Sequence, residues 1–158
     1  MGSRFLSNTH GAVSYEAMIE KIAAYIRQDT NYTYQLIVGT DSEAKGKEAD
    51  FVSAVVVHRL GKGGIYFWQK ENIKNIYHIA DRIGRETQYS LELAWKLRET
   101  FRHNGLAGIE PEVHLDVGEN GLTRDMIKWV TGMVLGSGFK FKIKPDSYGA
   151  SKVADRYT

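Results

Sequence analysis

Four acidic residues occupy related places in the predicted elements of this sequence: Asp41, Glu86, Asp116 and Asp155. If their carboxylates converge, each pair about 5 Å apart repels by about 3 kcal/mol at an effective dielectric near 20. Such a cluster protonates or separates unless cations bind between its members. All-oxygen ligands select Mg²⁺ or Mn²⁺ over zinc. Two such ions a few Å apart are suited to in-line phosphodiester hydrolysis, in which one activates water and the other stabilises the leaving oxygen.

Each acid also has an ordinary explanation. Asp41 follows the apolar run Leu36-Ile37-Val38 and is typical of a turn that caps neighbouring amides. In the same kind of explanation, Glu86 is a core acid that is paired with an arginine or caps a backbone group. Asp116 meets solvent at the end of its strand, and Asp155 is a solvated helix residue. His114 and Asp116 also form a His-x-Asp pair that could ligate zinc, although the sequence offers no further ligands for it.

The phase of one helix separates Glu86 from the other acids nearby. At about 100° per residue, Leu93 and Leu97 lie about 20° to either side of Glu86. Glu92 lies roughly 120° away from Glu86 by the same count. An acid on the buried stripe of a helix indicates a structural or functional role, whereas an acid on the solvent-exposed face does not. We therefore expect Glu86 to face the sheet and Glu92 to face solvent.

Hydrophobic periodicity predicts the elements that must position these acids. Residues 1–13 show no period and are expected to form a loose arm, after which Ser14 is the predicted N-cap of a helix. Residues 43–50 are expected to be a loop. The other predicted elements are strands at 36–41, 51–59, 65–69, 112–117 and 139–143, and helices at 79–101, 123–135 and from about 150. This order implies a mixed α/β sheet with helices on its faces.

Length and composition limit the possible classes of protein. A chain of 158 residues suits a single domain, 1–158, with an N-terminal arm and helix at 1–31 and a core at 32–158. The net charge of +2 is too small for nucleic-acid binding by bulk charge alone. The absence of cysteine excludes disulfides and thiolate chemistry. No apolar run has membrane-spanning length, so we expect no membrane partner and a cytoplasmic location.

The sequence resembles the YkuK-type proteins, bacterial sequences classed as predicted nucleases of the ribonuclease H-like superfamily. The resemblance runs from about Phe5 to Thr158. Its motifs are Val38-Gly-Thr-Asp-Ser42, Arg85-Glu-Thr-Gln-Tyr-Ser-Leu-Glu-Leu-Ala94, His114-Leu-Asp-Val-Gly118 and Ala150-Ser-Lys-Val-Ala-Asp-Arg156.

That resemblance implies a five-stranded sheet in the order 3-2-1-4-5, with strand 2 antiparallel. It also implies metal-binding and catalytic roles for Asp41, Glu86, Asp116 and a last acid, which is either Asp155 or Asp146. Two features depart from the superfamily: an extra helix precedes the first strand, and the stretch 146–149 lacks the histidine of cellular ribonucleases H.

A row of lysines accompanies the predicted acids. Lys140, Lys142 and Lys144 alternate along the last strand, where they either contact substrate phosphates or prevent edge-to-edge aggregation. Lys152 is expected to join them as a substrate contact. The sequence thus predicts a nuclease that uses two Mg²⁺ or Mn²⁺ ions on RNA, DNA or a hybrid. The alternative is a catalytically silent ribonuclease H-like module that binds nucleic acid or a protein partner.

Overall fold

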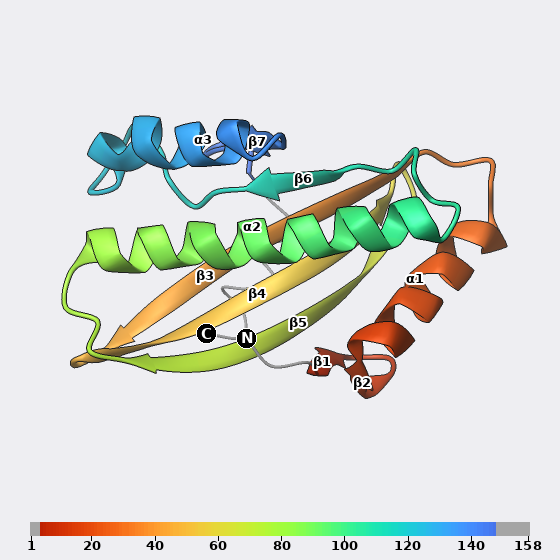
Figure 1. The fold of residues 1–158 in the computed structure, drawn as a ribbon, viewed down its shortest axis with the longest axis horizontal. Helices are drawn as coiled ribbons and strands as arrows, with labels where there is room; N and C mark the ends of the chain where they lie inside the picture. Colours follow the sequence, from red (N-terminus) through yellow and green to blue (C-terminus); the bar gives the residue numbers. More distant parts are fainter. Residues whose placement is uncertain (1–3, 148–158) are drawn as a thin grey trace.

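A seven-stranded mixed sheet runs through residues 4–147, the part of the chain that the computed structural model describes (Figure 1). Its strand order is β2-β1-β5-β4-β3-β6-β7. The strands are β1 Arg4–Ser7, β2 Gly11–Ser14, β3 Tyr34–Lys45, β4 Glu48–Arg59, β5 Gly64–Lys74, β6 Pro111–His114 and β7 Lys140–Lys142. The helices are α1 Tyr15–Gln28, α2 Ile79–His103 and α3 Ile127–Gly136, the last preceded by a 3-10 turn at Arg124–Met126.

The five core strands have the predicted topology. Strand β3 is central, with β4 antiparallel on one side and β6 parallel on the other. Strand β5 is antiparallel to β4, and β7 is parallel to β6. The order β5-β4-β3-β6-β7 is therefore the expected 3-2-1-4-5, and the expected fold class is confirmed.

The N-terminal arm and the segment 43–50 both differ from the prediction. The N-terminal arm forms a hairpin, β1–β2, which extends the sheet by pairing Leu6 with Trp68 of β5. The expected loop at 43–50 is absent, because β3 and β4 remain paired to the Lys45↔Glu48 end and turn at Gly46. Gly46 has a φ of 66°, which glycine adopts without strain. Each segment is too short or too polar for its alternation to be visible in the sequence.

The three described helices pack on one face of the sheet. Their buried side chains, such as Ile22, Leu97 and Val130, belong to one core cluster with Val38 and Val55 of the sheet. In Figure 1, α2 lies across β3, β4 and β5 while α3 runs beside it. The opposite face has its own apolar cluster: Ile37, Val52, Ala54 and Trp68. The helix predicted from about Ala150, which would give helices on both faces, lies outside the described residues.

The phase of α2 is as predicted. Glu86 is 5% exposed and lies on the same stripe as buried Leu93 and Leu97, whereas Glu92 is exposed. Ser14 caps α1 by accepting a hydrogen bond from the Ala17 amide. None of the described helices is long and apolar enough to cross a membrane.

Candidate metal centre

The strands that carry Asp41 and Asp116 separate just before these residues. Hydrogen-bonded pairing between β3 and β6 runs from Leu36↔Pro111 to Gly39↔His114. Beyond that point β3 continues along β4, and the chain after His114 bonds instead to the end of β7, through Leu115 N to Lys142 O, and to the segment after it, through Lys144 N to Val117 O. Asp41 and Asp116 each stand two residues past the last pair. Because side chains alternate along a strand, both lie on the face away from the described helices.

Glu86 approaches the same point from the other face of the sheet. Ser42 is adjacent to Asp41 in β3, so its side chain is directed towards α2. Its hydroxyl donates a hydrogen bond to a Glu86 carboxylate oxygen at 2.5 Å. Arg82, four residues before Glu86 on α2, donates through Nε to the Ser42 hydroxyl and through Nη2 to the Ser42 carbonyl, each at 3.1 Å. Ser42 therefore fixes Glu86 against the end of the β3–β6 ladder.

A buried row of hydroxyl groups fixes α2 one turn further along. Ser90 donates to Thr40 at 2.8 Å, and Thr40 is 2.8 Å from the hydroxyl of Ser53 in β4. All three side chains are buried, so each hydrogen bond offsets the cost of removing a polar group from water. This row of hydroxyl groups holds α2 in place along β3, and it thereby fixes the position of Glu86 relative to Asp41.

The three carboxylates interact electrostatically. Burial raises the pKa of Glu86 to about 8. The hydrogen bond from Ser42 opposes that rise, the charges of Asp41 and Asp116 add to it, and Arg82 opposes it. The structure thus brings Asp41, Glu86 and Asp116 into one electrostatic unit, although they come from β3, α2 and the chain after β6.

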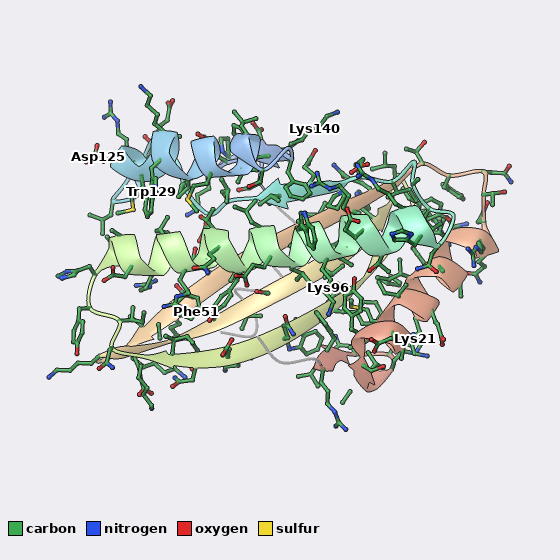
Figure 2. The ribbon with its side chains drawn as sticks, viewed as in Figure 1. Lys21, Phe51, Lys96, Asp125, Trp129 and Lys140 are labelled. Atoms are coloured by element: carbon green, nitrogen blue, oxygen red, sulfur yellow. The ribbon has the colours of Figure 1, made fainter. Side chains whose placement is uncertain are left out.

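Lysines take two different positions. Lys144 lies 2.8 Å from a carboxylate oxygen of Asp116, and this hydrogen bond raises the pKa of Lys144. Lys140 and Lys142 are exposed on β7, the edge strand of the described sheet, and Figure 2 shows Lys140 beside the end of α3. Both roles suggested for these lysines are compatible with an edge position.

The last predicted acid has two candidates. Asp146 is exposed and lies in a turn, where its amide bonds to the Ile143 carbonyl. Asp155 and Lys152 lie outside the described residues. His114 is buried, and its Nε2 lies 2.7 Å from Glu112, so Glu112 occupies one of its two ring nitrogens.

The donor set fits hard divalent cations in its chemistry. The three acids offer only oxygen atoms, and their mutual repulsion is relieved when a cation binds. Between residues 4 and 147, however, no three His, Cys, Asp or Glu side chains lie close enough to hold an ion as they stand. Ser42 and Lys144 instead occupy oxygens of Glu86 and Asp116.

Sequence reasoning missed the roles of Ser42, Arg82 and Lys144 at this centre. Two signals were available. Strand alternation places Ser42 opposite Asp41, and Arg82 precedes Glu86 by one helical turn. The Lys144–Asp116 contact joins segments whose relative positions only the folded sheet determines.

Three comparisons relate this chain to known proteins. A family model described as Ribonuclease H-like matches residues 17–158. The protein YkuK of Bacillus subtilis, which is described as uncharacterised, is 32% identical over 98% of this chain and 96% of its own length. Among solved structures, the N-terminal ribonuclease H domain of Rv2228c from Mycobacterium tuberculosis, solved as a fusion with maltose-binding protein, has a TM-score of 0.37. It is 16% identical, and the match covers 78% of this chain and 96% of that domain. From the family model and the Bacillus relative, this chain belongs to the ribonuclease H-like family.

Proposed function

We propose that this protein hydrolyses nucleic-acid phosphodiester bonds with two divalent ions, Mg²⁺ or Mn²⁺. The observation that carries the proposal is the position of Glu86: its side chain is buried, accepts a hydrogen bond from Ser42 and lies close enough to Asp41 and Asp116 for their charges to raise its pKa. Burial and the two acids outweigh the hydrogen bond from Ser42 and the charge of Arg82, so the deprotonated carboxylate of Glu86 lacks compensating positive charge. Asp41, Glu86 and Asp116 would hold the ions, with Asp155 or Asp146 as the remaining ligand.

The chain's own residues prepare the centre for cations. With a pKa of about 8, the Glu86 carboxyl is mostly protonated at neutral pH and must release that proton before it can act as a ligand. Ser42 and Arg82 keep the carboxyl oriented towards the end of the β3–β6 ladder. Lys144 can transfer its hydrogen bond from Asp116 to a phosphate oxygen. When bound, the ions would activate water and stabilise the leaving oxygen.

The alternative is a module that binds nucleic acid or a protein without cutting it. One set of contacts favours this alternative: Lys144 neutralises Asp116, and Ser42 satisfies an oxygen of Glu86. An acid cluster that is satisfied in this way does not require a metal in order to fold.

The two functions are separated by measuring metal binding and cleavage on the same protein. After chelation, millimolar Mn²⁺ should raise the melting temperature, because a ligand that binds only the folded state stabilises it. This shift should grow as the pH rises towards 8, since Glu86 then loses its proton more easily. Cleavage should appear on at least one member of a panel of RNA, DNA, hybrid and junction substrates.

The matched variants are Asp41→Asn and Glu92→Gln. Asp41→Asn should abolish both the Mn²⁺ shift and the cleavage. Glu92→Gln changes an exposed acid on the same helix as Glu86 and should retain both. A Mn²⁺ shift without cleavage of any substrate would favour the silent module, and equal melting with and without Mn²⁺ would refute the metal centre.

A further inference from the structure

A second candidate site lies at the other end of β6 and β7, where these parallel strands begin. A cavity of about 450 Å³ is bordered there by the start of β6, the start of β7 and the C-terminal half of α2. Asp41 and Asp116 follow the C-terminal ends of the paired strands, so this cavity is separate from the candidate metal centre.

The charged groups that line the cavity leave an excess of positive charge. Three cations, Arg98, Arg102 and Lys140, line it together with two carboxylates. Both carboxylates are already engaged. Glu110 lies 3.3 Å from Arg102, and Glu112 contacts His114 at 2.7 Å and Gln35 at 3.2 Å. Across the described part of the chain, neither Arg98 nor Lys140 has a carboxylate within ion-pairing distance.

Arg98 is held in place but is incompletely satisfied. Its guanidinium stacks on Phe139 at 4.1 Å from the ring centroid, and Nη1 donates one long hydrogen bond, 3.4 Å, to the Gly138 carbonyl. Its Nε is buried and has no hydrogen-bond partner among the described residues. Buried donors are rarely left without a partner. The guanidinium fork matches the geometry of phosphate oxygens, to which it can donate two parallel hydrogen bonds.

The dipole of α2 accounts for part of this arrangement. Cations are favoured near the C-terminus of a helix, and both arginines lie towards that end of α2. This explanation suffices for Arg102, which also has an acidic partner. It does not explain the buried Nε of Arg98, nor the placement of Lys140 from a different element beside the same cavity.

We propose that this cavity binds a phosphate group, with Arg98 donating through its fork and Lys140 supplying a second positive charge. The phosphate can belong to a free phosphate or nucleotide, or to the backbone of a nucleic acid.

The test uses inorganic phosphate as the probe, against chloride at equal ionic strength, with the full chain. Phosphate should raise the melting temperature more than chloride does, and titration calorimetry should give a dissociation constant. Arg98→Lys keeps the charge but removes the fork, and should weaken phosphate binding by roughly tenfold or more. Lys140→Gln should also weaken it. Lys128→Gln alters an exposed lysine of α3 that does not line the cavity, and should leave binding unchanged.

Lys140 is exposed on an edge strand, so its variant tests the site even if changes at Arg98 disturb folding. Competition by a short unphosphorylated oligonucleotide would identify backbone phosphates as the ligand, and its failure to compete would identify free phosphate or nucleotides. Equal effects of phosphate and chloride, or equal phosphate binding by the original protein and the Lys140→Gln variant, would overturn the proposal.

Discussion

Two buried carboxylates flank the same stretch of β3 and differ in their surroundings. Glu86 lies on the helix-covered face, held by Ser42, while Asp50 lies on the opposite face, in register with Glu43. Their exposed fractions are nearly equal, 5% for Glu86 and 6% for Asp50. Their pKa values nevertheless move in opposite directions, to about 8 for Glu86 and to about 2 for Asp50.

Burial acts to raise the pKa of both carboxyl groups, and it is outweighed by hydrogen-bonding partners only at Asp50. Asp50 receives hydrogen bonds from Lys45 at 2.5 Å and Asn72 at 2.8 Å, and Lys70 lies 3.7 Å away. Glu86 accepts one hydrogen bond, from the Ser42 hydroxyl, and its charged neighbours are the acids Asp41 and Asp116 and the cation Arg82. Asp50 thus obtains its cations from its own chain, whereas at Glu86 the charge of Arg82 does not offset burial and the two acids, and an external cation would do so if the proposed metal centre is right. Substitutions of Glu86 and Asp50, and the pH dependence of stability, should therefore separate these two acids.

The largest expected difference is in activity. If the proposed nuclease function is right, Glu86→Gln should reduce metal-dependent cleavage by about a hundredfold or more, because a lost ligand removes several kcal/mol of charge stabilisation. Asp50→Asn should leave cleavage of the folded protein within about threefold, a barrier change below 1 kcal/mol. Rates measured on both variants with the same substrate test this. Equal losses of activity would mean that the two acids do not differ in function.

The second prediction concerns the pH dependence of stability without metal. The pKa of Glu86 rises from 4.5 to about 8 on folding, so within this window the folded state holds a proton that the unfolded state has lost. The free energy of unfolding should therefore fall as pH rises through the window, by up to about 1.4 kcal/mol per pH unit. Denaturant melts of chelated protein measure the slope.

Glu86→Gln provides the control for this slope. The variant has no titrating group at this position, so most of the slope should vanish. Near pH 8 the metal-free variant should be at least as stable as the original protein, because its neutral amide is not repelled by Asp41 and Asp116. Strong destabilisation by Glu86→Gln would instead identify Glu86 as a structural acid.

The third prediction applies the opposite sign to Asp50. Its lowered pKa stabilises the fold fully above about pH 3.8, and this contribution is lost as pH falls through about 2. Asp50→Asn should cost about 1 to 2 kcal/mol at neutral pH, a modest amount because Lys45 is partly in solvent. Urea melts at pH 7 and pH 2 should show a difference between the variant and the original protein that nearly disappears in acid.

The smallest effect is expected at Glu92, the exposed acid of the same helix. Glu92→Gln removes one charge from the solvent face of α2, where Gln88 donates to it at 3.2 Å. Stability should change by no more than about 0.5 kcal/mol, as is usual for surface positions. A larger effect from this substitution would show that helical phase does not separate the acids of α2.

The sequence alone determined the order of the elements from α1 to β7 and the faces of Glu86, Glu92 and Asp116. The apolar run of β3 and the stripe of α2 are local patterns with fixed periods, so they predicted that Glu86 is buried and that Glu92 is exposed. Alternation likewise placed Glu112, His114 and Asp116 on one side of their strand. Such patterns are visible because each follows from the geometry of a single element.

The tertiary structure decided which elements supply the partners. The N-terminal hairpin has strands of four residues, too short for a visible period, and it becomes part of the sheet only by pairing with β5. The contact between Lys144 and Asp116, and the cavity that joins Arg98 to Lys140, depend on the register of strands that are far apart in sequence. Register between strands that are far apart in sequence is fixed only in the assembled sheet, so no local pattern predicted the contact of Lys144 with Asp116 or the cavity that joins Arg98 to Lys140.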